Sequence, residues 1–119
     1  MRQPPRPTMS AKTAEEVADV MFALSSPNRV RILGLLRERH YTVGELMDAL
    51  DMEQSAVSHQ LRLLRHLGLV TGTRQGKNTV YALYDNHVAA LLDEAVYHSE
   101  HLRLGLRDQV GQASIDTIA

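Results

Sequence analysis

One stretch near the end of the chain, from Asp85 to His101, constrains the fold most. Apolar side chains recur along it at the spacing of one helical face, which predicts an amphipathic helix. The recurring residues are Val88, Leu91, Leu92 and Ala95, and Leu102 directly after the stretch continues the same face. The same stretch holds one carboxylate and three of the six histidines of the chain, at Asp85, His87, His98 and His101. Because carboxylate oxygen and imidazole nitrogen bind borderline divalent metals, the pattern predicts a metal-binding helix with an apolar stripe.

The spacing of these side chains shows that one copy of the helix cannot complete a metal site. At about 100° per residue, the three histidines fall within roughly 60° of one another along one edge of the apolar stripe. His87 and His98 are nevertheless eleven residues apart, which is roughly 16 Å along a helix axis. Bonds from such a metal to nitrogen or oxygen are only about 2.0–2.2 Å long. Two copies packed antiparallel about a two-fold axis would bring the first ligand pair of one chain beside the second pair of its partner, which gives two shared sites per homodimer.

The alternative interpretation is a dimer helix without metal. Asp85 stands before an apolar periodic run, which suits a helix N-cap, and any single histidine taken alone is more often an incidental surface residue. All four side chains together, with the i, i+3 pair His98 and His101 and the fitting antiparallel geometry, favour metal binding.

Size and composition indicate a soluble, intracellular protein of one domain. With 119 residues, of which 44% are hydrophobic, the chain can bury only a modest core, so dimerisation would help to stabilise it. No apolar run approaches the roughly 18 residues of a membrane span and no signal peptide is recognisable, so we expect a cytoplasmic location and no membrane partner. The absence of cysteine excludes disulfides, thiolate metal ligands and a thiol redox switch.

Three segments are expected along the chain. Residues 1–11 contain three prolines and hardly any apolar side chain, which predicts a disordered arm. Residues 12–102 are expected to form the folded dimer domain. Residues 103–119 carry no strong periodicity, which predicts a flexible tail.

Two helices are predicted at the start of the folded domain. The first begins near Thr13, where Glu16 completes a capping box. The second is capped by Ser26 and has Pro27 at its first position. A short link then leads to a third helix within residues 42–50.

The residues from Gln54 to Leu67 form the most regular amphipathic pattern in the chain. Their apolar side chains share one face, and small polar and basic side chains project from the other. With the preceding helix and a three-residue turn, this pattern is typical of a helix-turn-helix. The following segments, Leu69–Arg74 and Lys77–Tyr84, predict a β-hairpin that turns at Gln75-Gly76. We therefore expect a mostly α fold with a small β-hairpin, of the α+β class, namely a winged helix-turn-helix.

Charge is distributed unevenly, although the net charge is only −1. Residues 54–84 contain no Asp or Glu, whereas basic side chains lie on the predicted recognition helix and wing. This segregation concentrates positive potential where DNA phosphates would bind, and chance clustering is the alternative. The predicted DNA-contacting residues are Gln54, Ser55, Ser58 and His59 at base edges, and Arg62, Arg74 and Lys77 at phosphates.

Two motifs resemble those of a known family. The run M-E-Q-S-A-V-S-H-Q-L-R, residues 52–62, looks like the recognition helix of the ArsR/SmtB family of bacterial metal-sensing repressors. D-x-H and, after ten intervening residues, H-x-x-H resemble the last-helix metal site of zinc and nickel/cobalt sensors in that family. The resemblance covers about residues 13–106.

The resemblance implies a homodimer that pairs through its first and last helices. Such a dimer occupies operator double-stranded DNA when metal-free, on the bacterial nucleoid, and releases it when metal binds, which usually derepresses an efflux gene. It also implies an allosteric contact from His98 to a backbone carbonyl near Leu67 or Gly68.

Two departures from the family patterns narrow the choice of metal. Arsenic, cadmium and lead sensors carry cysteines around the first helix of the helix-turn-helix, where residues 42–46 of this chain have none. Arg103 and Val110 stand where the nickel/cobalt sensor has further histidines. A site of three imidazoles and one carboxylate is naturally four-coordinate, so Zn(II) is the favoured effector and Ni(II) or Co(II) is the alternative.

Two other functions compete with a metal-responsive repressor. A hydrolytic enzyme is disfavoured, because four protein ligands leave no position for water and no H-E-x-x-H signature is present. The second competitor is a winged-helix regulator whose metal is structural or no longer sensed. A metal-dependent change in operator affinity separates a sensor from this alternative.

Overall fold

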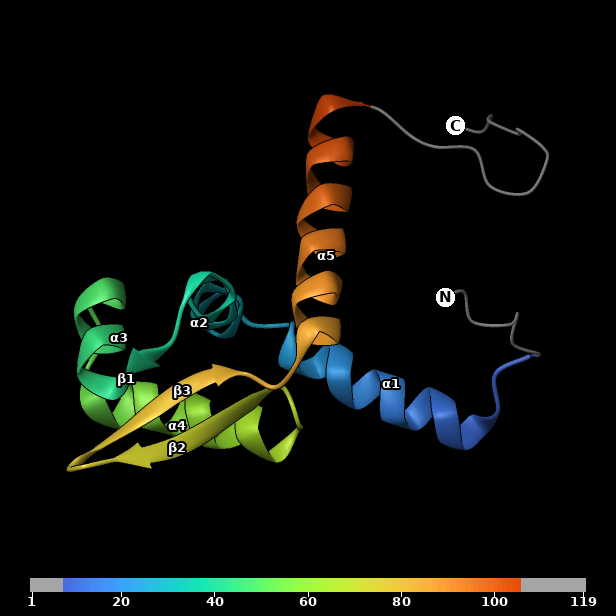
Figure 1. The fold of residues 1–119 in the computed structure, drawn as a ribbon. Coiled ribbons are helices and arrows are strands. Elements are labelled where there is room, and N and C mark those ends of the chain that lie inside the picture. Colours follow the sequence, from blue (N-terminus) through green and yellow to red (C-terminus); the bar gives the residue numbers. More distant parts are fainter. Residues whose placement is uncertain (1–7, 106–119) are drawn as a thin grey trace.

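The computed structural model describes residues 8–105, which form a winged helix-turn-helix from which two helices project (Figure 1). In chain order the elements are α1 (Ala11–Ala23), α2 (Pro27–Glu38), β1 (Tyr41–Thr42), α3 (Val43–Leu50), α4 (Gln54–His66), β2 (Val70–Gln75), β3 (Asn78–Leu83) and α5 (Asn86–Leu104). Helices dominate the described residues and the strands form one small antiparallel sheet, which confirms the predicted fold class. Residues 1–7 of the expected arm and 106–119 of the expected tail lie outside the described residues.

The first two helices start at capping side chains. α1 begins earlier than predicted because its N-cap is Ser10, not Thr13. The Ser10 hydroxyl accepts a hydrogen bond from the backbone N–H of Thr13 at 3.1 Å, so Ala11, the last residue of the expected arm, already belongs to the helix. The prediction for α2 is confirmed, with Ser26 as its N-cap and Pro27 in its first turn.

The sheet contains a strand that the sequence does not predict. β1 lies at one edge in the order β1-β3-β2, with Tyr41 opposite Tyr81. It leads directly into α3, whose start is a capping box in which the Thr42 hydroxyl and the Glu45 carboxylate each accept a hydrogen bond from the other residue's backbone N–H. β1 therefore ties the first helix of the helix-turn-helix to the wing.

The hairpin of β2 and β3 is confirmed, but its turn lies one residue later than predicted. Gln75 pairs with Asn78, so Gly76 and Lys77 form the turn in place of Gln75-Gly76. Gly76 has a φ of 63°, a left-handed conformation that glycine adopts without steric cost. A glycine at the first loop position is typical of a type II′ hairpin turn.

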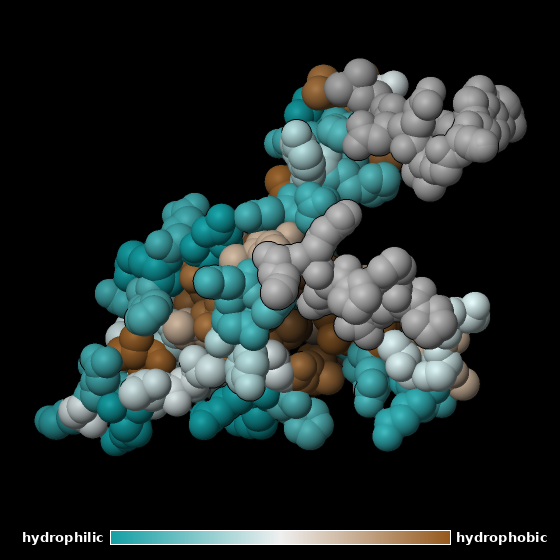
Figure 2. Space-filling view, turned by 45° about the vertical axis from the view of Figure 1, so that its right-hand side comes forward, coloured by the Kyte–Doolittle hydropathy of each residue, from teal (hydrophilic) through white to brown (hydrophobic). Residues whose placement is uncertain are grey.

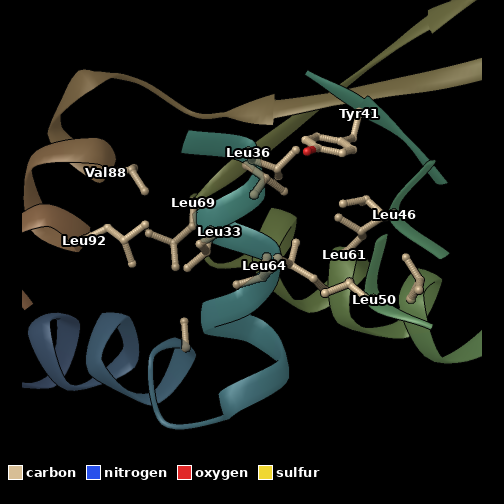
Figure 3. Close-up of a cluster of buried hydrophobic side chains, with 14 residues drawn as sticks. Leu33, Leu36, Tyr41, Leu46, Leu50, Leu61, Leu64, Leu69, Val88 and Leu92 are labelled. Carbon is tan, nitrogen blue, oxygen red and sulfur yellow. The ribbon is translucent and has the colours of Figure 1, made fainter. Parts of the chain in front are cut away.

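The core lies between α2, α3, α4 and the sheet, and α5 reaches it only through its first turns (Figure 3). The buried apolar residues are Ala23, Ile32, Leu33, Leu36, Tyr41, Leu46, Leu50, Val57, Leu61, Leu64, Leu69, Val70, Val88 and Leu92. Leu33 and Leu64 lie near the middle of this cluster, and Val88 and Leu92 close its side next to Leu69. Full burial of each leucine, isoleucine or valine in this cluster stabilises the fold by about 1.5–3 kcal/mol.

α5 begins in the core and then leaves it. Asp85 is its N-cap, as the alternative interpretation of this helix, a dimer helix without metal, expects. The helix ends at Leu104, before Gly105 in the left-handed conformation, so Arg103 and Leu104 are helical where a tail was expected. Beyond Leu92 its side chains are exposed, apart from a half-buried histidine, and Figure 1 shows the helix rising away from the winged domain.

Large apolar side chains remain exposed on the two projecting helices. They are Val17, Met21 and Phe22 on α1, and Val96, Tyr97, Leu102 and Leu104 on α5. Figure 2 shows apolar surface at the foot of α5 next to α1. Exposed apolar patches of this kind mark interaction surfaces. Across residues 8–105, none of the helices combines the length and apolar character that a membrane crossing needs.

Candidate metal and nucleic-acid sites

The first pair of predicted metal ligands lies at the base of α5. One carboxylate oxygen of Asp85, Oδ1, caps the helix by accepting hydrogen bonds from the backbone N–H groups of His87 at 2.9 Å and Val88 at 3.3 Å. The other oxygen, Oδ2, lies 3.5 Å from Nδ1 of His87. The cap therefore fixes one oxygen and leaves the second beside an imidazole.

The environment of Asp85 keeps its carboxylate ionised. Partial burial acts to raise the pKa of this carboxyl, but hydrogen bonds from the Val88 backbone and from the ring and backbone of His87 outweigh it, so the pKa lies below its ordinary value. The His87 side chain is 91% exposed. An ionised carboxylate beside an accessible imidazole fits the donor set of a zinc-type site.

The second pair of predicted ligands lies farther along α5, where the helix has left the core. His98 and His101 share one face of the helix there, and the His101 ring lies 4.8 Å from the ring of Tyr97, centre to centre. Within the part of the chain that the structure describes, no three His, Cys, Asp or Glu side chains of one protomer are close enough to hold a metal. The four predicted ligands of one protomer therefore fall into two separate pairs, and metal binding by these pairs together with a second chain stays a prediction.

The predicted allosteric contact is not formed within one protomer. Gly68 follows α4 in a left-handed conformation with φ 78°, and its N–H donates to the Arg65 carbonyl at 3.1 Å. Among residues 8–105, no hydrogen bond joins the His98 ring to the carbonyl of Leu67 or Gly68. The contact is therefore a prediction for the metal-bound dimer.

The predicted DNA-contacting residues gather on α4 and the wing. α4 buries Val57, Leu61 and Leu64 and turns its other side to solvent. On that side Gln54, Ser55, His59 and Arg62 are exposed and Ser58 is half-buried. Arg74 and Lys77 are exposed at the tip of the hairpin, which Figure 1 shows alongside α4. The structure thus brings the seven residues to one helix and one adjacent wing.

Gly72 allows the wing to pack closely against α4, a role that the sequence alone does not reveal. A Cβ atom at this position would lie 3.0 Å from Cε1 of Tyr81, 3.1 Å from Cγ2 of Thr79 and 3.4 Å from Nη1 of Arg65. The missing side chain therefore lets Arg65 of the recognition helix approach the sheet closely. No sequence motif marks this role, because Gly72 resembles any other glycine in a strand.

A bidentate ion pair fixes the base of α5 to α2. Nε and Nη2 of Arg37 donate to the two carboxylate oxygens of Asp93 at 3.0 Å and 2.9 Å. The hydrogen bond from Arg37 lowers the pKa of Asp93, and the same bond raises the pKa of Arg37. Because the partners are far apart in sequence, no local pattern predicts this contact.

A helix-turn-helix with an adjacent wing defines a class of DNA-binding transcriptional regulators, and comparisons with known proteins agree. The pattern of the family described as bacterial regulatory protein, arsR family, matches residues 26–71. The HTH-type transcriptional regulator NmtR of Mycobacterium tuberculosis is 55% identical over 108 residues, which cover 91% of this chain and 90% of that protein. A transcriptional repressor SmtB homolog of Synechocystis is 40% identical, with 82% and 74% covered. The chain belongs to the ArsR family.

Solved structures support the same assignment. The solution structure of apo-NmtR has a TM-score of 0.70 and 53% identity, and the likeness covers 95% of both chains. A homodimeric winged helix-turn-helix DNA-binding domain from Mycobacterium bovis, described as a possible ArsR-family regulator, has a TM-score of 0.75 at 26% identity, with 86% of this chain and 97% of that one covered. These relatives are transcriptional regulators rather than enzymes.

Proposed function

We propose that this protein is a metal-responsive repressor that holds operator DNA when metal-free and releases it when a divalent metal binds between two chains. The observation that carries the proposal is the division of the four ligands into two half-sites on α5. Asp85 and His87 lie at its base and His98 and His101 farther along, and one protomer does not bring three of them together. A second antiparallel copy supplies what each half-site lacks.

The surface of the projecting helices supports the dimer. Exposed apolar side chains on α1, among them Met21 and Phe22, and on α5, among them Val96 and Tyr97, lie outside the core of the single chain. Contiguous apolar surface is stabilised when a partner covers it. Pairing through α1 and α5 would bury these residues and align the two α5 helices on which the half-sites lie.

The metal that fits this donor set best is Zn(II), with Ni(II) or Co(II) as the alternative. Three imidazoles and one carboxylate satisfy a tetrahedral ion, and the described residues of α5 offer no additional histidine. The ion would join two chains through one coordination sphere. The regulated genes are, on this proposal, those of metal efflux.

Residues of the chain itself then transmit the effect of metal binding to the recognition helix. A liganding histidine donates its second ring N–H to a nearby acceptor, which fixes its orientation. The acceptor that we propose for His98 is the carbonyl of Leu67 or Gly68, directly after the recognition helix. Locking this contact changes the spacing of the two recognition helices, so that they no longer match successive major grooves.

In the DNA-bound form, the seven predicted residues of α4 and the wing contact the operator. Short side chains at Ser55 and Ser58 let the helix approach base edges, and the exposed amide of Gln54 is free to pair with an adenine. Arg74 and Lys77 reach the phosphate backbone from the wing.

A mixed-dimer experiment tests the shared site. A His87→Ala chain and a His101→Ala chain carry different affinity tags, and their heterodimer is isolated by two purification steps. Both lesions fall in the same site, so the heterodimer keeps one intact site and binds one zinc per dimer, while each homodimer has none intact. A heterodimer that binds no zinc tightly contradicts sharing between chains.

Measurement of operator affinity with and without zinc separates the two candidate roles of the metal. A sensor loses operator affinity by roughly 5- to 150-fold when metal binds, as expected for couplings of about 1–3 kcal/mol. A structural ion raises the thermal stability of the dimer and leaves operator affinity unchanged.

A further inference from the structure

Arg29 is the one charged side chain among the buried residues of 8–105, with only 9% of its surface exposed. No carboxylate within that range lies at ion-pairing distance from it. A buried cation is costly unless hydrogen bonds and dipoles replace its hydration. Its surroundings therefore determine what the residue does.

Most of these surroundings come from the end of α1. Nε of Arg29 donates to the Ala23 carbonyl and Nη2 to the Phe22 carbonyl, both at 2.9 Å. The guanidinium carbon also lies 5.0 Å from the centre of the Phe22 ring. The carbonyl end of a helix is the negative end of its dipole, so the cation stabilises the last turn of α1.

The remaining nitrogen of the guanidinium points to the recognition helix. Nη1 of Arg29 donates to Oε1 of Gln60 at 3.3 Å. Gln60 lies on α4 between exposed His59 and buried Leu61, half-buried itself. One side chain from α2 thus joins the end of α1 to the middle of the helix that is expected to enter the major groove.

This link matters because α1 is attached to the winged domain at one end only. Ala23 is its single buried residue, and Val20 and Leu24 add partial contacts near the same end. Among the side-chain hydrogen bonds of residues 8–105, those of Arg29 are the ones that connect α1 to α2 and α4. A rotation of α4 relative to α1 would break or lengthen the bond to Gln60.

We propose that Arg29 and Gln60 are positioning residues that set the angle between the dimer helix α1 and the recognition helix α4, and that the metal response depends on this angle. The inference rests on the proposed function, because it requires α1 to lie in the dimer interface. Neither residue touches metal or, on the assignment above, DNA. The link transmits a change in dimer shape to the DNA-reading helix.

The test compares two identical substitutions on the same helix. Gln60→Leu removes the acceptor while keeping the side-chain volume similar, and Gln54→Leu makes the same chemical change at an exposed predicted DNA contact. Full-length wild type and both variants are titrated with an operator fragment, with and without zinc. The measured quantity is a ratio, the dissociation constant for the operator with zinc divided by the constant without zinc.

Gln60→Leu is expected to reduce this ratio roughly tenfold, the scale of one lost hydrogen bond to a charged group. The dimer dissociation constant should stay close to wild type, because Gln60 is outside the core. The midpoint of thermal unfolding should fall, because one nitrogen of the buried Arg29 loses its acceptor. Gln54→Leu should weaken operator binding with and without zinc alike and leave the ratio unchanged.

Two further variants keep the proposal testable if Gln60→Leu perturbs folding. Gln60→Glu retains an acceptor for Arg29, so the ratio should be preserved even where the added charge weakens DNA binding. Arg29→Lys keeps the buried cation but loses the branched guanidinium group whose Nη1 reaches Gln60. It should therefore reduce the ratio as Gln60→Leu does. The double variant should be no worse than either single one, since both break the same bond.

The outcomes separate this inference from the proposed function. If zinc leaves the operator affinity of wild type unchanged, the proposed function is wrong and the inference falls with it. If wild type responds and Gln60→Leu responds equally, the inference alone is overturned. An equal loss of both affinities in Gln60→Leu would also overturn it, because that result indicates an ordinary DNA contact.

Discussion

The winged domain and the two projecting helices use apolar side chains in opposite ways. From α2 to β3, residues such as Leu33 and Leu64 are fully buried within one chain. On α1 and α5, Met21 is 51% exposed and Leu102 is 67% exposed in the same chain. The first region is therefore stabilised by its own packing, whereas the second carries apolar surface that only a partner can cover.

This difference separates the stability of each chain from the association of two chains, which are often measured together. Substitutions in the winged domain should change the free energy of unfolding of each chain. Substitutions on the projecting helices should change association, so their effects depend on protein concentration. Four predictions, from the largest expected effect to the smallest, test that separation.

Leu64→Ala should lower the free energy of unfolding by about 2–5 kcal/mol, because it leaves a cavity in the core. Urea denaturation at several protein concentrations measures this, and the loss should be the same at each one. Leu102→Ala is the matched control, since the same atoms are removed from an exposed position on α5. If Leu102→Ala lowered the free energy of unfolding as much as Leu64→Ala, and by the same amount at every protein concentration, the two regions would not differ in the proposed way.

Met21→Glu should raise the dimer dissociation constant by about 100-fold, since two-fold symmetry places the new charge in the interface twice. Analytical ultracentrifugation measures the constant, and circular dichroism should show that helix content is retained. Operator affinity should fall in parallel because two recognition helices act together. If the variant remains as dimeric as wild type, α1 does not lie in the dimer interface.

Lys77→Ala should weaken binding to all DNA sequences similarly and flatten the dependence on salt by about one phosphate contact per wing. Gln54→Ala should instead reduce discrimination by about 1–3 kcal/mol at one base pair. Binding titrations on the operator and on unrelated DNA at several salt concentrations distinguish the two effects. A loss in Lys77→Ala that is confined to the operator would contradict its assignment to phosphate.

Asp93→Asn should cause the smallest change, because the ion pair with Arg37 is exposed to solvent. Arg37 lowers the pKa of Asp93 in the folded chain, so the pair stabilises the fold above the ordinary aspartate pKa of about 3.9. That contribution disappears as the pH falls through the lowered pKa. Unfolding of wild type and variant should therefore differ at neutral pH and converge in acid, and a constant difference would assign the effect to packing.

The sequence predicts the elements whose causes are local. Ser26 and Pro27 define the start of α2, Asp85 caps α5, and the apolar period of residues 54–67 gives the recognition helix, each within a few positions of its cause. The start of α1 was misplaced because Ser10 and Thr13 are both good caps, and a local rule does not choose between caps one turn apart.

Features that depend on distant partners were not predictable. β1 has only two residues and exists because β3 pairs with it. The bonds from Arg29 to Gln60 and from Arg37 to Asp93 join positions with no shared motif. For the candidate metal site, spacing along α5 showed that one chain is insufficient, but the partner geometry depends on an interface that a single chain does not contain.

The division of ligands along α5 has a consequence for the cell that makes this protein. If each site takes two ligands from each chain, an isolated chain has no complete site, and the apparent affinity for metal rises with the abundance of the regulator. The threshold at which metal releases the operator is then a property of gene dosage as well as of coordination chemistry. On the operator the protein is already dimeric, and additional metal-free dimer competes to rebind it. A cell that produces more of the protein would therefore need a higher concentration of free ion to clear the operator, so expression level would set the threshold of the sensor.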